Sequence, residues 1–357
     1  MQIDGHHALT YIAARFAKFS HAKASIIAHC SQYVDDATNS GSIRFDNDAM
    51  YHRISSAHKM LDYRNFDELS NHMVWTPFHF LPGNDGKEAG ADHRGSFIKK
   101  IVCYPDSYIS RDMLKACIIE KDKPYNLHRL GISMHVYADT WAHQGFAGVT
   151  NRVNEVSNIV SNVKSLDKSW WGKIKTYFVS ETFPLGHGAA LSHPDRPYLV
   201  WSYENCFGKV IKRDNPSDFL EATDYMCRAM QCYQNNDLSM DLDNAEGLPE
   251  NDKKVVARLI KSIKEKTSEL RHEKWLAQIA KGVFSFGAVD ISYKPKGKGS
   301  WKHKAIGQIA AADTGREIFK YKDSFLTSHW KYFHDALQAH RFDVIHNILP
   351  RYGICVS

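Results

Sequence analysis

The feature that most constrains this chain is a run of three metal-competent side chains at a spacing of four residues. In HVYADTWAH, His135, Asp139 and His143 stand at positions i, i+4 and i+8. At roughly 100° per residue, a step of four residues drifts by only about 40°, so in a helix all three lie on one face, about 6 Å apart. The middle carboxylate has two oxygens and can bridge two cations. The pattern predicts a helix over residues 127–144 with a metal site on one face.

One helix face cannot surround an ion, so the remaining ligands must come from elsewhere in the chain. The sequence is rich in suitable side chains, since 20 of its 357 residues are histidines. Its 7 cysteines are odd in number and form no CxxC pair, which argues against a thiolate zinc site and against a disulfide framework. We therefore expect nitrogen and oxygen ligands.

The spacing of apolar residues predicts helices along most of the chain, and strand-like alternation is scarce. We therefore expect an all-α fold, with a compact multi-helix catalytic domain over residues 1–240 and a C-terminal helical extension over residues 241–357 that packs on it. An acidic, Asn-rich stretch marks the boundary. The predicted helices cover residues 8–19, 22–34, 50–62, 64–72, 110–120, 127–144, 216–234, 250–282, 304–320 and 326–347.

The charge and the hydropathy pattern predict a soluble protein. With 46 basic and 40 acidic residues the net charge is +6, which permits attraction to phosphates or anionic lipid surfaces without requiring it. The opening MQIDGHH has no secretory signal pattern, and no stretch reaches the ~18 apolar residues of a membrane span. We expect a protein that is cytoplasmic in its producer or delivered to a host cell by a signal-independent secretion route.

The HxxxDxxxH helix resembles the signature helix of the zinc-dependent phospholipase C and single-strand nuclease superfamily, and the signal-less bacterial branch of these phospholipases looks most similar. Members also have a Gly-His pair that opens the first helix, which corresponds here to Gly5-His6. An aspartate follows an early helix in the family, and Asp35 or Asp36 takes that place here. A histidine between that aspartate and the signature helix corresponds to His79.

The resemblance covers residues 4–200 and implies an all-helical fold that holds two or three Zn²⁺ ions. Family members have a last ligand group after the signature helix, for which GHGAALSHPD supplies candidates. The resemblance assigns three ligand sets: Asp35 or Asp36 with His79, His135 and Asp139; His143 with His187 and His193 or Asp195; and His6 with Asp139 and Asp4.

Two expectations about the metals follow from this assignment. In familiar members the amino group of the mature N-terminus binds one zinc, and here we expect the Asp4 carboxylate to replace it. Nitrogen and oxygen ligands suit zinc, while manganese is the alternative on the carboxylate-rich side.

The resemblance implies a phospholipase C, a phosphoric diester hydrolase that cuts the glycerol-side phosphodiester of phosphatidylcholine-like lipids. A zinc-activated hydroxide would attack phosphorus and release diacylglycerol and a phosphorylated head group. The catalytic residues would be Asp139, which bridges ions, and Asp35 and Asp36, of which the one that does not bind metal handles the proton.

Two segments that mix basic and aromatic residues, 168–178 and 293–304, predict peripheral contact with a phospholipid membrane or micelle. No obligate protein partner is indicated. The same composition also suits stacking of single-stranded nucleic acid, so a nuclease or other phosphodiesterase on the same scaffold is the rival enzyme. The alternative of another class is a non-catalytic helical binding protein with a structural metal.

Overall fold

The computed structural model of the chain describes residues 1–57, 68–92, 96–163, 186–310, 313 and 315–356. The predicted membrane-contact segment 168–178 lies outside these residues. The helices are η1 (Asp4–Leu9), α1 (Thr10–Phe16), α2 (His21–Asp36), α3 (Glu68–Phe78), η3 (Asn84–Gly86), α4 (Phe97–Ile101), α5 (Tyr108–Ile119), α6 (Asn126–Ala142), η4 (Arg152–Asn154), η6 (Gly188–Ala190), α8 (Asn215–Asn235), η7 (Leu242–Asn244), α9 (Glu250–Ser262), α10 (Ser268–Ala280), α11 (Trp301–Ile306), η8 (Asp323–Phe325), α12 (His329–Phe342), η9 (Asp343–Ile348) and η10 (Leu349–Tyr352). The strands are β1 (Gly41–Phe45), β2 (Met50–Arg53), β3 (Val156–Ser161), β4 (Val200–Asn205), β5 (Val210–Asp214) and β6 (Ile318–Phe319).

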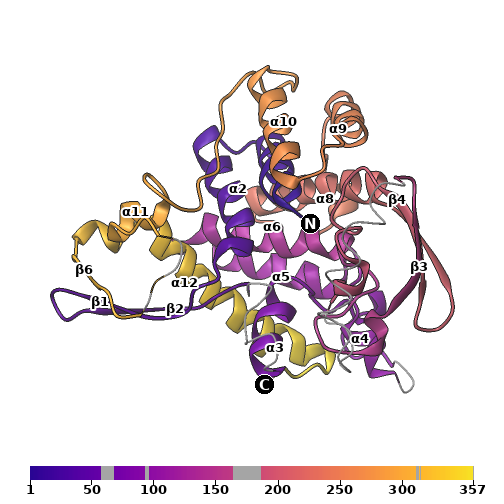
Figure 1. Cartoon of the computed structure of the whole chain (residues 1–357), viewed down its shortest axis with the longest axis horizontal. Helices are drawn as coiled ribbons and strands as arrows, with labels where there is room; N and C mark the ends of the chain where they lie inside the picture. Colours follow the sequence, from indigo (N-terminus) through magenta and orange to yellow (C-terminus); the bar gives the residue numbers. More distant parts are fainter. Residues whose placement is uncertain (58–67, 93–95, 164–185, 311–312, 314, 357) are drawn as a thin grey trace.

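Helix α6 forms the centre of the molecule and packs against α2, α5, α8 and α12 (Figure 1). Every residue from His128 to Ala142 is buried. A helix that is covered on all sides can carry polar side chains only where neighbouring elements supply partners for them. The metal-competent residues of α6 therefore lie in the interior of the fold.

Glycine at position 131 permits the close approach of α2 and α6. A Cβ atom on Gly131 would lie 2.4 Å from the carbonyl oxygen of Ile27 and 2.6 Å from the Cβ of Cys30, both on α2. These distances are far below van der Waals contact, so only glycine fits without moving one of the helices. One turn further along α6, His135 Nδ1 reaches the backbone carbonyl of Ser31 on α2 at 2.7 Å.

The prediction of an all-α fold is wrong, because the structure contains two three-stranded sheets. The first has the order β2–β1–β6, in which β1 pairs antiparallel with β2 and parallel with β6. The second, β3–β4–β5, is antiparallel throughout. In β4 the side chains of Trp201 and Tyr203 are buried while the intervening Ser202 is partly exposed, as expected of a strand with one covered face. The fold is therefore mixed α and β.

Three predicted helices differ from the structure. Residues 50–53 form strand β2, because their backbone groups bond to β1. The helix expected over 250–282 is two helices, since Ile263 is extended and Thr267 caps α10 by accepting a hydrogen bond from the Leu270 amide. Of the described residues in the helix expected over 304–320, only those at the end of α11 are helical.

Residues on both sides of position 240 contribute to the largest buried core cluster. Helix α10 packs on η1, α9 packs on α8, and α12 packs on α6. The division into a domain and an extension stays a prediction. Within the described residues, every helix is too short or too polar to span a lipid bilayer.

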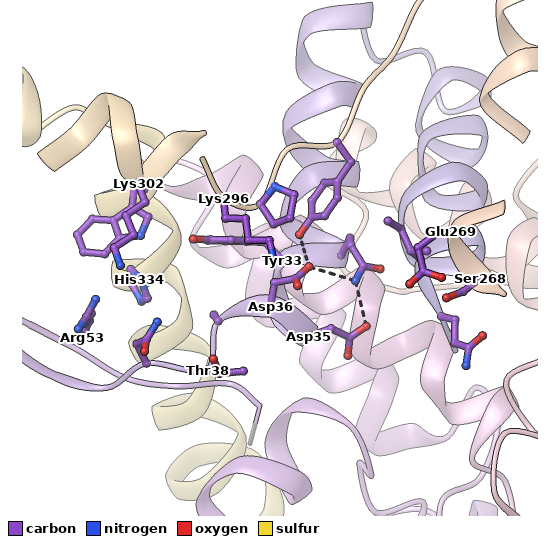
Figure 2. A pocket seen from close by; sticks show the side chains of 18 residues that line it. Tyr33, Asp35, Asp36, Thr38, Arg53, Ser268, Glu269, Lys296, Lys302 and His334 are labelled. Atoms are coloured by element: carbon purple, nitrogen blue, oxygen red, sulfur yellow. Dashed lines mark hydrogen bonds between the residues drawn. The ribbon is translucent and has the colours of Figure 1, made fainter. Parts of the chain in front are cut away.

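A cavity of about 710 Å³ opens beside the C-terminal end of α2, between that helix, β2 and residues from α10, α11 and α12 (Figure 2). Its lining includes Asp35 and Asp36 from α2, and Arg53 at the end of β2.

We expect the substitution Gly131→Ala to destabilise the protein. Alanine gains roughly 1 kcal/mol over glycine in helix propensity, but overpacking of a filled interface typically costs about 1–3 kcal/mol. The clash is with backbone atoms of α2 that cannot move alone, so the cost should dominate. Thermal unfolding followed by circular dichroism should give a lower midpoint, while Lys274→Ala on the exposed surface of α10 should leave the midpoint unchanged. An unchanged or raised midpoint for Gly131→Ala would contradict this account of the α2–α6 contact.

Candidate metal centre

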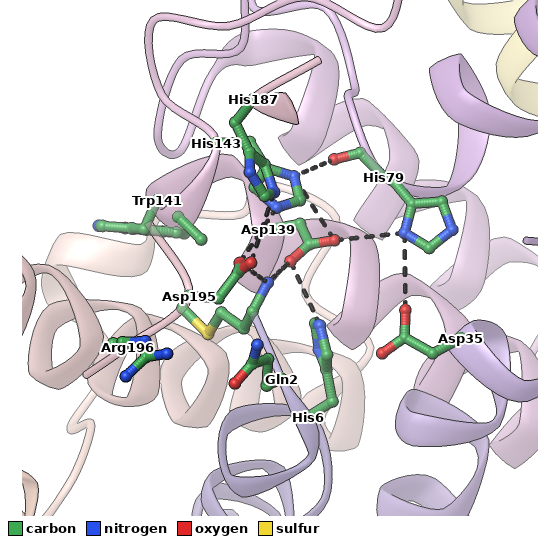
Figure 3. Close-up of polar contacts among 12 residues, drawn as sticks. Gln2, His6, Asp35, His79, Asp139, Trp141, His143, His187, Asp195 and Arg196 are labelled. Carbon is green, nitrogen blue, oxygen red and sulfur yellow. Dashed lines mark hydrogen bonds and ion pairs between the residues drawn. The ribbon is translucent and has the colours of Figure 1, made fainter. Parts of the chain in front are cut away.

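In the part of the chain that the structure describes, three groups of histidine and aspartate side chains lie close enough together to hold metal ions. In each group the candidate ligand atoms all lie within 4.8 Å of one another. The groups come from η1, the end of α2, the residue after α3, α6 and the loop before β4, and Figure 3 shows them converging on Asp139. The groups are His79, His135 and Asp139; His143, His187 and Asp195; and His6, Asp35 and His135.

Backbone carbonyls orient the histidines of this cluster. His135 Nδ1 donates to Ser31 O at 2.7 Å, and His79 Nε2 donates to Ser56 O at 2.8 Å. His143 Nδ1 donates to the carbonyl of His79 at 2.7 Å. A carbonyl oxygen can only accept, so the nitrogen that faces it carries the hydrogen, and the second nitrogen of each neutral ring is an acceptor. Bonds of this kind fix the ring and the tautomer of metal-binding histidines.

The first group, together with Asp35 of the third group, has the dimensions of a tetrahedral site. The two acceptor nitrogens, His135 Nε2 and His79 Nδ1, face each other at 3.2 Å. Asp139 Oδ2 lies 3.3 Å from the first and 3.6 Å from the second, and Asp35 Oδ1 lies 3.9 Å from both. A tetrahedron with bonds of about 2.0–2.1 Å has edges of roughly 3.3–3.4 Å. Four acceptor atoms at these distances repel one another unless a cation lies between them.

The second group lies at the C-terminal end of α6 and in the loop that precedes β4. Asp195 is 3.6 Å from His143 Nε2 and 3.5 Å from His187 Nε2. His187 Nδ1 donates to the carbonyl of Leu191 at 2.9 Å, and Leu191 has the left-handed φ of 56°, which is unusual for a branched residue. Phe80 stacks on the His143 ring at 4.5 Å. A strained loop and a stacked ring therefore hold this group in place.

The third group contains His6, which lies in the π-helical segment η1 and stacks on the His135 ring at 3.7 Å. His6 Nε2 is 3.3 Å from Asp139 Oδ1, but neither ring nitrogen of His6 has a hydrogen-bond partner among the described residues. Because Asp139 Oδ2 faces His79 and His135 while Oδ1 faces His6, the two oxygens point to different groups.

The amino group of Met1 lies where the sequence led us to expect the Asp4 carboxylate. It donates a hydrogen bond to Asp139 Oδ1 and is 3.3 Å from Asp195 Oδ1. Asp4 instead forms a buried ion pair with Arg271, whose Nε donates to Asp4 Oδ2 at 2.6 Å. The Met1 amine was not among the expected ligands, because the Asp4 carboxylate was expected to take the place of an N-terminal amine.

Two other candidate ligands, Asp36 and His193, belong to none of the three groups. Asp36 accepts hydrogen bonds from the Tyr293 hydroxyl at 2.5 Å and from Gln32 at 3.4 Å. His193 Nδ1 donates to Ala190 O at 2.9 Å. The candidate ligands that the structure brings together are His6, Asp35, His79, His135, Asp139, His143, His187 and Asp195.

The electrostatics of the cluster are those of buried carboxylates that need cations. Burial opposes the charge of Asp139, but His143, the Met1 ammonium group and His6 outweigh burial and hold the pKa of Asp139 well below its usual range. Burial also opposes the Met1 charge, yet Asp139 and Asp195 raise the pKa of that amine to about 10. Burial lowers the pKa of His143 to about 4, so its ring is neutral and fit to bind metal near pH 7.

These observations fit a metal centre. Three carboxylates, those of Asp35, Asp139 and Asp195, lie close to a single ammonium group, and burying unpaired charge is costly. The unpartnered His6 nitrogens and the facing acceptors of His79 and His135 have the geometry that a cation would satisfy. The chain is thus a mixed α and β protein with a buried cluster of histidine and aspartate residues that could hold metal ions.

A sequence comparison shows the family of this chain. The model of the family described as "Family of unknown function (DUF6765)" matches residues 1–348, so the chain belongs to that family. Neither the curated proteins nor the solved structures give a match.

We expect the first two groups to bind metal independently. After loading with Zn²⁺ and desalting, the metal content should be at least two ions per chain. His79→Ala should remove the ion of the first group, His187→Ala that of the second, and the double variant should lose both, since each ring supplies one ligand atom. His346→Ala, at an exposed position, is the control. The assignment fails if the wild-type protein takes up no zinc, or if both single variants keep the full content.

We expect acid to destabilise the fold between about pH 6.5 and 4. Among the buried histidines that the structure describes outside the three groups, five have pKa values lowered to about 3 or 4, each with burial as the largest cause. In the unfolded chain they take up protons below about pH 6.5, whereas the folded state resists protonation, so stability falls as the pH falls. The loss is up to roughly 1.4 kcal/mol per pH unit for each of them. They are His29, His128, His334 and His340, with pKa values of about 3, and His272, with a pKa of about 4.

Urea unfolding at pH 7, 6 and 5 measures this dependence. Asp4, Asp35 and Asp36 have raised pKa values because of burial and act in the opposite direction, but they titrate from a lower reference value near pH 4. A free energy of unfolding that is constant or rises from pH 7 to pH 5 would contradict the prediction.

Proposed function

We propose that this protein is a zinc-dependent phosphoric diester hydrolase that acts as a phospholipase C. The observation that carries the proposal is the convergence of acceptor atoms of Asp35, His79, His135 and Asp139 at tetrahedral distances, next to a second group around Asp195. Neighbouring metal sites that share a carboxylate suit phosphodiester hydrolysis, because two ions can act on the attacking and the leaving oxygen. The resemblance of the HxxxDxxxH helix to zinc-dependent phospholipases supports the same reaction.

The cavity beside α2 provides a place for the substrate. Its volume of about 710 Å³ lies in the range of small-ligand sites. Asp35 belongs both to a ligand group and to the cavity lining, and its side chain is 34% exposed, whereas Asp139 is 1% exposed. A substrate in the cavity would therefore meet the metal centre at Asp35.

Zinc, when bound, supplies Lewis acidity that lowers the pKa of water from 15.7 towards about 7 and neutralises charge on the phosphoryl oxygens. The chain's own residues hold the geometry. His79 and His135 present their acceptor nitrogens because Ser56 and Ser31 hold the opposite nitrogens. Asp139 links the groups through its two oxygens. The packing around α6 excludes bulk water from this side of the centre.

We assign the role of proton acceptor in the reaction to Asp36. It lies in the cavity wall beside Asp35, and Tyr293 and Gln32 fix its carboxylate by hydrogen bonds to Oδ2. Asp36 belongs to none of the ligand groups, so its carboxylate stays available to hold a proton at this wall of the cavity.

The basic segment 293–304 gives little support to the rival nuclease. Its aromatic rings pack inward, since Tyr293 donates to Asp36 and Trp301 stacks on His29 at 3.8 Å. Rings in such contacts are not free to stack on nucleic acid bases. Lys294, Lys296 and Lys298 are exposed, so contact of this segment with a lipid surface stays a prediction.

The activity is tested with zinc-loaded protein that carries any tag at its C-terminus, which leaves Met1 as in the structure. We expect release of a phosphorylated head group from phospholipid micelles and no cleavage of a single-stranded oligonucleotide. Asp139→Asn should lower kcat by at least about 10³-fold, because an amide cannot bridge two ions as a carboxylate can. Asp290→Asn, at an exposed position, should retain full turnover.

The outcomes distinguish three hypotheses for the site: a phospholipase C, a nuclease, and a binding protein with a structural metal. Cleavage of the oligonucleotide alone would support the nuclease. Zinc binding without cleavage of either substrate would support a binding protein with a structural metal. Full activity of Asp139→Asn would show that the proposed centre does not carry the reaction.

A further inference from the structure

The end of the cavity remote from Asp35 is built from cationic and neutral nitrogen groups. Arg53 from β2, Lys302 from α11 and His334 from α12 line it, and Figure 2 shows them on the opposite side of Asp36 from Asp35. We call these three residues the cationic wall. The cavity therefore has an acidic end, where the metal groups lie, and a basic end that has no role in the proposed reaction.

Arg53 and Lys302 of the cationic wall are buried cations that share a carboxylate partner. The side chains of Arg53 and Lys302 are each only 5% exposed, and both pair with the single carboxylate of Asp313. Arg53 reaches Asp313 Oδ2 at 2.5 Å, and Lys302 binds Oδ1. His334 is neutral, because burial and then the neighbouring Arg53 lower its pKa to about 3.

Two polar atoms of the cationic wall have no hydrogen-bond partner within the described part of the chain. They are Arg53 Nε and His334 Nδ1, and both residues are more than nine-tenths buried. Leaving a buried donor such as Arg53 Nε unpaired is costly, so an acceptor bound at this end of the cavity would stabilise it. A guanidinium with a free donor is the side chain best suited to a carboxylate or phosphate.

The ring of Trp330, which lines the cavity beside the cationic wall, is not available to a quaternary ammonium group. Trp330 lies in the lining, and the guanidinium carbon of Arg53 is 5.8 Å from its ring centre. A choline group is held in proteins by aromatic faces, and here the face of Trp330 is already in contact with a cation. A second cation at this position would be repelled by Arg53 and Lys302.

We propose that the cationic wall binds a second anionic group on the substrate, so that the preferred lipid has an anionic head group such as that of phosphatidylserine. This inference rests on the proposed phospholipase C activity. The scissile phosphodiester lies at Asp35 and the metal groups, and the head-group carboxylate lies at Arg53 and Lys302. The preference differs from the phosphatidylcholine-like head group that the family resemblance implies.

Kinetics on two short-chain lipids test the preference. Zinc-loaded full-length protein is assayed with monomeric dihexanoyl phosphatidylserine and dihexanoyl phosphatidylcholine. We expect a higher kcat/KM for the serine lipid, and we expect Arg53→Gln to reduce the ratio of the two values by roughly tenfold, the effect of one charge-assisted hydrogen bond. Lys302→Gln should reduce it in the same direction and serves as the second variant if Arg53→Gln does not fold.

Arg44→Gln is the matched control. It removes an arginine charge from the adjacent strand β1, at an exposed position outside the cavity lining, and should leave the ratio unchanged. A ratio near one in the wild-type protein, a preference for the choline lipid, an equal effect of Arg44→Gln, or preferential cleavage of an oligonucleotide would overturn the inference.

Binding separates this inference from the proposed activity. Isothermal titration of the zinc-loaded protein with O-phosphoserine and with phosphocholine requires no turnover. We expect tighter binding of O-phosphoserine, and a loss of roughly tenfold in its affinity in Arg53→Gln but not in Arg44→Gln. If no lipid is cleaved while this binding pattern is found, the phospholipase activity fails and the anion site stands. Equal affinity for the two ligands, or an affinity for O-phosphoserine that Arg53→Gln does not change, overturns the anion site.

Discussion

The candidate site depends on hydrogen bonds between histidine rings and backbone carbonyls. His79, His135 and His143 each use one nitrogen to donate to a carbonyl of a neighbouring element, and the second nitrogen then points towards the carboxylates around Asp139. The carbonyls belong to Ser56, Ser31 and His79, so the backbone outside α6 sets the direction of the rings. This arrangement brings acceptor atoms together in the interior, where only a cation can make their proximity favourable.

The same arrangement explains why the fold around α6 is so tightly packed. The bond from His135 to Ser31 requires α2 and α6 to approach closely, and Gly131 is the residue that permits this approach. Asp35 lies in the last turn of α2, so the helix that accepts the hydrogen bond also carries a carboxylate to the centre and to the cavity. Packing and site geometry are therefore two consequences of one helix contact.

The cavity connects regions of opposite charge that come from distant parts of the sequence. The acidic end derives from α2, whereas Arg53, Lys302 and His334 come from β2, α11 and α12. Buried charge of both signs at the two ends of one cavity suits a substrate that presents two anionic groups, one to bound metal and one to guanidinium and ammonium groups.

Local sequence patterns were enough to predict the central helix and most of the major helices. They also predicted those candidate ligands that are recognised by short spacings or by their immediate neighbours in the sequence. A four-residue repeat of His, Asp and His on an otherwise apolar helix fixes which side chains share a face. The sheets were missed because their strands are only two to six residues long, and because β6 pairs with β1 from a distant part of the chain. Three contacts could be seen only in the folded chain. They are the ion pair of Asp4 with Arg271, the hydrogen bond of Asp36 with Tyr293, and the contact of the Met1 amine with Asp139. Helical periodicity is a property of residues that are close together in the sequence. The partner of a buried charge, in contrast, is whichever distant group the folded chain brings within hydrogen-bond distance.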